Sequence, residues 1–176
     1  MTNQPPAVKL PQASERFPEA SPPYSSDPMK SIIRKAEADW KGNLREGHGL
    51  VTTDSGALSK QPFSFNKRVD QGDLAQTNPE ELIAAAISSC FSMALSKTIQ
   101  DDDVIPQQLL VTASVTAEFG DGLKITTLQL EVEGMVGDYS QEQLEKAVAT
   151  TRKNCPVYLL LEPGFKSIEV TTRLRN

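Results

Sequence analysis

The chain has 176 residues, with 18 lysines and arginines against 23 aspartates and glutamates, and its formal net charge is -5. This length predicts a single domain. The negative charge argues against nucleic acid or an anionic membrane surface as a partner. The longest mostly apolar run, residues 82–95, is shorter than the ~20 residues that a bilayer span requires, so we expect no membrane span.

The cysteine and histidine content narrows the chemistry that the chain could perform. His48 is the only histidine, and with Cys90 and Cys155 it provides too few soft ligands for a zinc site, so we expect no metal and no other cofactor. The first ten residues, MTNQPPAVKL, lack the positive and apolar segments of a secretory signal, which makes the reducing cytoplasm the expected location. There, the two cysteines are expected to be thiols rather than a structural disulfide.

The N-terminal segment differs in composition from the rest of the chain. Seven of the 12 prolines lie in residues 1–28, a segment without hydrophobic periodicity. We therefore expect a flexible proline-rich extension over residues 1–28 and a folded domain over residues 29–176.

Three short strands are expected next. Residues 35–41 alternate, with Ala36, Ala38 and Trp40 on one face, which predicts a half-buried strand. A shorter strand is predicted over residues 49–53, and residues 63–69 are interpreted as a third. Together they would form an antiparallel meander.

A long helix is predicted from Thr77 to Ile99. Asn78 can cap it, Pro79 suits its first position, and Glu80 and Glu81 lie where the helix dipole favours anions. The helix is apolar nearly all round for its first four turns, so we expect burial on most sides. That requires a second cover, either more of the same chain or a partner subunit.

The C-terminal half begins with the clearest β pattern. Residues 111–119 alternate in polarity, a turn follows at residues 120–122, and the second arm changes phase at Thr126 and Thr127, which predicts a β-bulge. Ser140 and Gln143 then form a capping box before an amphipathic helix with Leu144, Ala147, Val148 and Thr151 on one face.

The remaining elements complete an α+β order. Pro156 can open a fresh helix through Leu161, with Cys155 near its cap, and residues 167–173 form a last strand. Without regular alternation of strands and helices, this order predicts an α+β fold with an antiparallel sheet.

Taken alone, each candidate reactive residue has an ordinary structural explanation. Cys90, inside the long helix, is more often a small core residue. Cys155, at a helix start, would meet unpaired N–H groups that favour the thiolate, which ranks it as the more activated thiol. Arg68 could be a surface cation, and Glu80 a helix-start anion. Spacing alone does not show whether the cysteines meet.

Three separated blocks nevertheless resemble one protein family in order and spacing. They are FNKR at residues 65–68, TNPEELIAAAISSCFSMALS at residues 77–96 and NCPVYLLL at residues 154–161. They closely resemble the osmotically inducible protein C and organic hydroperoxide resistance (OsmC/Ohr) family, and NPEELI followed by CFSMALS is more similar to the osmotically inducible branch. The likeness extends from about Ser31 to the final strand.

The resemblance implies a thiol peroxidase that reduces organic hydroperoxides in stress defence. It implies antiparallel sheets packed on a long central helix, in an intertwined homodimer with its sites at the subunit interface. Cys90 would be the peroxidatic cysteine, Cys155 the resolving cysteine, Arg68 the residue that stabilises the thiolate, and Glu80 its carboxylate partner. An external dithiol would reduce the disulfide, and the resemblance suggests that a lipoylated protein carries it. Many members carry histidine where this chain has Ile87, a change that affects pocket shape.

Helix geometry adds an expectation of its own. Ten positions separate Glu80 from Cys90, so on one helix they lie ~15 Å apart along the axis and cannot touch. If both line one site, we predict that Glu80 comes from the partner subunit. The alternative function is a stress-associated dimer that binds an apolar ligand and whose thiols are structural.

Overall fold

The computed structural model describes residues 31–69 and 76–175. The predicted extension over residues 1–28 lies outside the described residues, so its flexibility remains a prediction. Residues 35–176 belong to one compact unit, separate from the residues before it. Ile32 and Ile33, in the described part of the preceding segment, are exposed.

The first sheet is an antiparallel meander, as predicted. It contains β1 (Ala36–Lys41), β2 (His48–Thr53) and β3 (Gln61–Phe63), in that spatial order. Gly49 on the middle strand pairs with Trp40 on one side and Phe63 on the other. A β-carbon at Gly49 would lie only 2.4 Å from Phe63 Cζ, so glycine leaves room for the two aromatic rings, whose centroids are 5.6 Å apart.

Two predictions for this region were wrong. All six residues of β1 are exposed, so the strand is not half-buried within one chain. The third strand ends at Phe63, and Phe65–Val69 form a short helix, α1, whose Arg68 N–H donates to the carbonyl of Ser64 at 3.2 Å. Alternation over so few residues does not distinguish a strand from one helical turn.

The long helix, α2, spans Pro79–Gln100 and begins as predicted. The Asn78 side chain accepts a hydrogen bond of 2.8 Å from the N–H of Glu81. Its buried residues recur every four positions and form one stripe, made of Ile87, Phe91, Leu95 and Ile99. Within one chain only this stripe is buried, so of the two predicted covers the partner subunit is the one that stays a prediction.

The uncovered face of α2 carries small and apolar residues. Ala85, Ala86, Ser89 and Met93 are exposed, and Met93 retains 68% of its accessible surface. At 22 residues, α2 is also longer than the apolar run in the sequence, and by length and composition it could cross a membrane. Its buried stripe and capped start are those of a helix that packs along a sheet.

The second sheet contains β4 (Gln108–Gly120), β5 (Gly122–Met135) and β6 (Ser167–Arg175), with β5 in the middle. The β4–β5 register shifts between Thr116 and Ala117, where Thr126 is the extra residue, so the predicted bulge is confirmed. Thr126 is buried, and its carbonyl accepts a hydrogen bond of 2.8 Å from the N–H of Lys166, just before β6.

Between β5 and β6 the chain forms α3 (Gln141–Asn154), α4 (Pro156–Leu161) and a short 3₁₀ turn, η2 (Glu162–Gly164). The predicted capping box of Ser140 and Gln143 is present. The buried residues of α3 are the four predicted from the sequence, Leu144, Ala147, Val148 and Thr151.

The antiparallel prediction holds for β4 and β5 but is wrong for β6, which pairs with β5 in parallel. The α3–α4 segment carries the chain back to the other end of the sheet, as a parallel connection requires. The fold is therefore α+β with one antiparallel and one mixed sheet.

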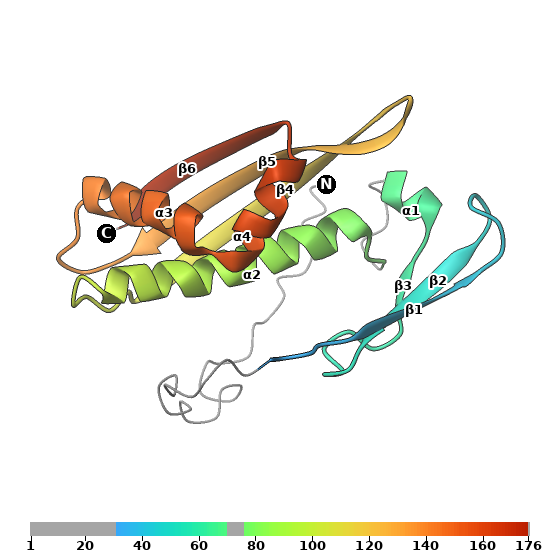
Figure 1. Ribbon diagram of the computed structural model, residues 1–176, viewed down its shortest axis with the longest axis horizontal. Helices are drawn as coiled ribbons and strands as arrows, with labels where there is room; N and C mark the ends of the chain where they lie inside the picture. Colours follow the sequence, from blue (N-terminus) through green and yellow to red (C-terminus); the bar gives the residue numbers. More distant parts are fainter. Residues whose placement is uncertain (1–30, 70–75, 176) are drawn as a thin grey trace, which may run out of the picture. The chain divides into compact units, whose positions relative to one another are not determined.

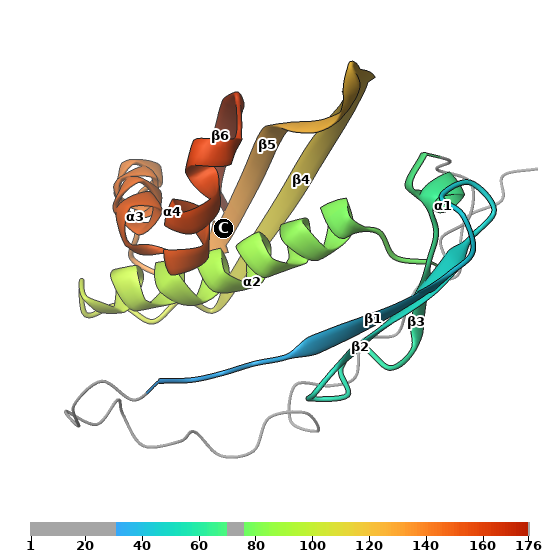
Figure 2. The same cartoon turned by 45° about the vertical axis from the view of Figure 1, so that its right-hand side comes forward.

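The helices α2, α3 and α4 lie on the same side of the β4–β5–β6 sheet (Figures 1 and 2). α2 contacts β4, and α3 contacts β6. The core between the layers includes fully buried Leu128, Leu130 and Val132 from the central strand β5. This layer brings the middle of α2 against α4, and with it the two cysteines.

Candidate active site

Cys90 lies in the middle of α2 and is half-buried. It directly precedes Phe91, which belongs to the buried stripe, and its side chain packs against the edge of the core. Cys90 is thus packed against the core but keeps part of its surface accessible.

Cys155 occupies the junction between α3 and α4 and is fully buried. Its N–H donates to the carbonyl of Thr151 at 2.8 Å, which closes α3, and its carbonyl accepts from the N–H of Leu159 at 3.0 Å, which opens α4. Pro156 has no N–H and suits the first position of α4. The backbone is therefore fixed on both sides of the cysteine.

The two cysteine side chains are neighbours. Burial raises the pKa of Cys155 above its ordinary value, and hydrogen bonding to Cys90 and the negative charge of Cys90 raise it further. The N–H groups of Tyr158 and Val157 lower this pKa, although Cys155 forms no regular capping hydrogen bond. Burial is the largest of these effects.

The prediction that the start of α4 activates the Cys155 thiol was therefore wrong. The N–H groups expected at the start of α4 do act on Cys155, but a complete loss of solvent outweighs them. Cys155 is the thiol that ionises with difficulty, and Cys90 is the one that solvent reaches.

Two contacts hold the cysteine-bearing segments together. The rings of Phe91 and Tyr158 meet edge to face, with centroids 6.0 Å apart and planes at 63°. Thr151 donates a hydrogen bond of 3.2 Å to Thr98 on α2. One contact lies beside Cys90 and the other one turn before Cys155, so α2 packs against the α3–α4 junction on either side of the thiols.

Arg68 and Glu80 form a separate pair at the start of α2. The Nε atom of Arg68 donates to both carboxylate oxygens of Glu80, at 2.9 and 3.0 Å, and its Nη2 also donates to Oε1. The side chains retain 25% and 13% of their accessible surface. Such a charge-assisted, multiply bonded pair fixes the plane of the guanidinium group.

The structure brings the four predicted site residues together in two pairs, not in one cluster. Among the described residues, neither Arg68 nor Glu80 forms a hydrogen bond or ion pair with a cysteine. Glu80 and Cys90 lie on one continuous helix, whose rise separates them by ~15 Å along its axis.

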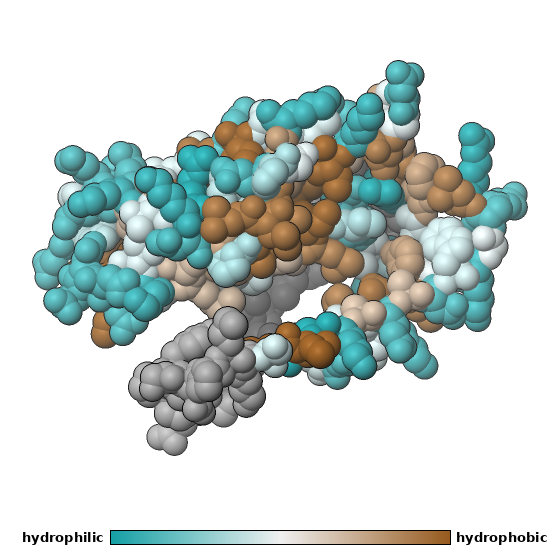
Figure 3. All heavy atoms as spheres, in the orientation of Figure 1, coloured by the Kyte–Doolittle hydropathy of each residue, from teal (hydrophilic) through white to brown (hydrophobic). Residues whose placement is uncertain are grey.

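Exposed apolar side chains surround the cysteine region. Met93 on α2 and Leu159 and Leu160 on α4 are exposed, with Leu160 at 77%. In Figure 3, hydrophobic side chains gather over the middle of the molecule, where α2 and α4 lie in Figure 1. An exposed apolar surface of this kind is typical of a binding interface.

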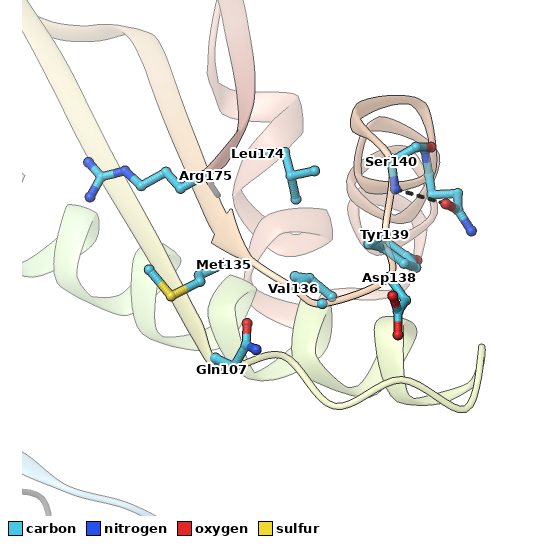
Figure 4. Close-up of a pocket in the computed structure, with 10 residues that line it drawn as sticks. Gln107, Met135, Val136, Asp138, Tyr139, Ser140, Leu174 and Arg175 are labelled. Carbon is cyan, nitrogen blue, oxygen red and sulfur yellow. Dashed lines mark hydrogen bonds between the residues drawn. The ribbon is translucent and has the colours of Figure 1, made fainter.

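A cavity of about 580 Å³ opens elsewhere, at the end of β5. Figure 4 shows Met135, Val136 and Tyr139 among its lining residues, with Arg175 from the end of β6. The Tyr139 hydroxyl donates a hydrogen bond of 2.7 Å to Asp102, which follows α2. Neither cysteine, nor Arg68 nor Glu80, lines this cavity.

Comparisons with known proteins show the family to which the chain belongs. The family profile described as OsmC-like protein matches residues 71–170. The chain belongs to the OsmC-like family. It is 37% identical over 133 residues to peroxiredoxin OsmC of Escherichia coli strain K12, which covers 75% of this chain and 92% of that protein.

The OsmC-like chain is also similar to proteins named for organic hydroperoxide resistance. An organic hydroperoxide resistance protein-like sequence of Staphylococcus aureus strain MSSA476 is 31% identical over 113 residues, covering 64% of this chain and 76% of that protein. The crystal structure of the organic hydroperoxide resistance protein OhrB of Bacillus subtilis has a TM-score of 0.59 at 22% identity, covering 80% of this chain and 98% of that one. This last similarity shows a shared fold.

Ile87 has a clear place in the OsmC-like fold. It is fully buried in the stripe of α2 that faces the core, so in the single chain it is a packing residue. Sequence reasoning missed Arg152, Tyr158 and Glu162, which form a hydrogen-bonded group around the Cys155 junction. Their only signal was spacing: Arg152 lies three positions before the cysteine and Tyr158 three after it.

Within the described residues, no group of three or more histidine, cysteine, aspartate or glutamate side chains is arranged to hold a metal ion.

Proposed function

We propose that this protein is a cysteine-based peroxidase that reduces organic hydroperoxides to alcohols. The observation that carries the proposal is the neighbouring pair of free thiols, one accessible and one buried, on the fold of a family whose relatives are named peroxiredoxin and organic hydroperoxide resistance protein. Cys90 acts first, because only its thiol has an accessible side.

In the first step the Cys90 thiolate attacks the distal oxygen of the hydroperoxide. The S–O bond forms as the O–O bond breaks, the sulfur is oxidised to sulfenic acid, and the alkoxide leaves and takes a proton to become the alcohol. In the second step the Cys155 sulfur attacks the sulfenic sulfur. The S–S bond forms, and the hydroxide that leaves takes a proton to become water.

The cycle closes when an external dithiol reduces the Cys90–Cys155 disulfide by exchange and becomes a disulfide itself. A lipoyl group on a partner protein has this chemistry and remains the proposed reductant. The cytoplasmic location predicted from the sequence suits such a cycle, because that compartment keeps dithiols reduced.

Arg68 and Glu80 complete the site from a second copy of the chain. The guanidinium group would stabilise the Cys90 thiolate and donate hydrogen bonds to the peroxide oxygens, while Glu80 holds it in plane. Arg68 and Glu80 lie at the start of α2, whereas Cys90 lies in its middle. The pair can therefore act on this thiol only from the partner subunit of a homodimer. The exposed small and apolar face of α2 supports such an intertwined assembly.

Thiol counting tests this function against the alternative. The reduced protein is treated with one equivalent of an alkyl hydroperoxide per chain, and its free thiols are counted before and after. The peroxidase loses two thiols per chain and yields the alcohol. A dimer that only binds an apolar ligand loses none, and that result would replace our proposal with this alternative.

A further inference from the structure

Tyr158 is a fully buried phenol with partners on both sides of the Cys155 junction. Its hydroxyl accepts a hydrogen bond of 2.9 Å from Nε of Arg152 and donates one of 3.2 Å to Glu162. Burial raises the pKa of Tyr158, and this outweighs the opposite effect of Arg152, so the phenol keeps the proton that it donates. A buried hydroxyl that both accepts and donates a hydrogen bond holds its side chain in one position.

The two partners belong to the elements that Cys155 joins. Arg152 lies in the last turn of α3, and Glu162 directly follows α4. The Arg152 guanidinium carbon lies 5.6 Å from the Tyr158 ring centroid, and its Nη2 lies 3.8 Å from Oε1 of Glu162. This group, which we call the junction clamp (Arg152, Tyr158 and Glu162), therefore fastens α4 to the end of α3 across the cysteine.

Tyr158 also touches the surroundings of both thiols. Its N–H is one of the two backbone groups that lower the pKa of Cys155, and its ring packs on Phe91, the residue next to Cys90. The charged or titratable groups that act on this junction are Cys90 from α2, Arg152 from α3 and Glu162 after α4. One residue thus contacts the surroundings of both sulfurs.

We propose that Tyr158, held by Arg152 and Glu162, is a positioning residue that sets the rate at which Cys155 closes the disulfide with Cys90. The inference rests on the proposed function, because closure is its second step. Neighbouring sulfurs must still approach to ~2.05 Å with a defined torsion angle. The junction clamp limits the orientations that Cys155 can adopt, which favours the one that leads to the bond.

The variant Tyr158→Phe tests this inference because it keeps the ring against Phe91 and removes only the hydroxyl. Tyr139→Phe is the matched control: it deletes another hydroxyl that is hydrogen-bonded to a carboxylate, at the cavity away from the cysteines. Loss of the clamp should slow closure by roughly fivefold, the equivalent of one hydrogen bond, and leave the rate of sulfenic acid formation unchanged. Tyr139→Phe should change neither step.

Closure can be measured without a hydroperoxide, which separates this inference from the proposed function. A chromogenic aryl disulfide reacts with Cys90, forming a mixed disulfide and releasing one aryl thiolate. Cys155 then attacks the Cys90 sulfur of that mixed disulfide and releases a second aryl thiolate. The second phase reports closure alone, so a protein that ignores hydroperoxides can still show it.

We expect Tyr158→Phe to slow the second phase and to shift its pH profile to higher pH, because the α4 N–H groups then hold the Cys155 sulfur less firmly. A second phase with the wild-type rate and pH profile would overturn the inference, as would the absence of a second phase in the wild type. If circular dichroism shows that Tyr158→Phe is unfolded, Glu162→Gln decides by the same readouts, because Glu162 is partly exposed and its loss removes only the clamp's acceptor charge.

Discussion

Cys155 neighbours Cys90 although one lies between α3 and α4 and the other in the middle of α2. The negative charge of Cys90 raises the pKa of Cys155, an effect that requires the two sulfurs to be close. The same relationship distinguishes the two thiols: burial raises the pKa of Cys155, whereas Cys90 is only half-buried. That difference underlies the roles proposed for them.

Replacing Cys155 with serine should stop the cycle at its first product. With no resolving thiol, one equivalent of hydroperoxide should leave one sulfenic acid per chain at Cys90, trapped by a dimedone-type reagent and located by peptide mass spectrometry. Turnover with a dithiol should fall sharply. Cys90→Ser is the control and should trap no adduct. A Cys155→Ser protein without any sulfenic acid would reverse the assignment of the two cysteines.

Glu80→Gln should slow the first step without affecting the fold. The amide keeps the shape of the side chain but loses the charge that holds the Arg68 guanidinium through its Nε and Nη2 donors. A lost charge-assisted interaction corresponds to about a tenfold lower second-order rate constant for Cys90 oxidation.

The neighbouring variant Glu81→Gln is the control for this change. The Glu81 side chain accepts a hydrogen bond from Thr77 and has no contact with Arg68 among the described residues. It should oxidise at the wild-type rate. Equal losses in both variants would show that the charge at the helix start matters, rather than the pair with Arg68.

Mixed dimers should reveal whether the site crosses the subunit interface. Neither Arg68→Ala nor Cys90→Ser should be active alone, but their heterodimer combines an intact Cys90 from one chain with an intact Arg68 from the other. Random pairing makes half of the dimers mixed, each with one complete site, so activity should return to about a quarter of the wild-type value.

Mixing Cys90→Ser with Cys155→Ser provides the matched control, because these two thiols neighbour each other within one chain. No mixed dimer then contains a complete thiol pair, so disulfide formation should not return. If the Arg68→Ala and Cys90→Ser mixture also stays inactive, the two pairs do not meet across an interface, and the proposed dimeric site is wrong.

The sequence predicted correctly those features of the fold that depend on interactions between residues close together in the chain. The Ser140–Gln143 capping box, the bulge at Thr126 and the cap at Asn78 all depend on residues within a few positions of one another. The parallel pairing of β6 with β5 has no such local signal, because it depends on how the α3–α4 segment returns across the sheet.

In the candidate site, too, features that depend on nearby residues were predicted and features that depend on distant residues were not. The sequence showed that Cys155 lies at the start of α4, but it did not show the complete burial of this residue, because Phe91 and much of the surrounding core come from segments distant in the sequence. The pairing of Arg68 with Glu80 was implied only by the family resemblance, since Arg68 lies on a short helix, α1, that the alternation pattern concealed. Periodicity indicates which side of an element is apolar, not which groups meet there.

The last prediction concerns the hydrogen bond between Tyr139 and Asp102. Burial, followed by this hydrogen bond and the charge of Asp102, raises the pKa of Tyr139 from 10.0 to about 12. The folded protein therefore keeps the phenolic proton at a pH where the unfolded chain loses it. The stability gained is fully present below pH 10 and is lost as the pH rises towards 12.

Urea denaturation of the wild type and Tyr139→Phe between pH 8 and 12 measures this contribution, with the range set by the two pKa values. At the lower end, the variant should be less stable by about 1 kcal/mol, the contribution of one hydrogen bond. The difference should shrink as the pH rises, because only the wild type loses the phenolic proton on unfolding. Asp102→Asn keeps an acceptor without the charge, so the folded-state pKa of Tyr139 should be lower and the decline should end at lower pH. A difference that stays constant with pH would show that the Tyr139 phenol titrates alike in the folded and unfolded chains.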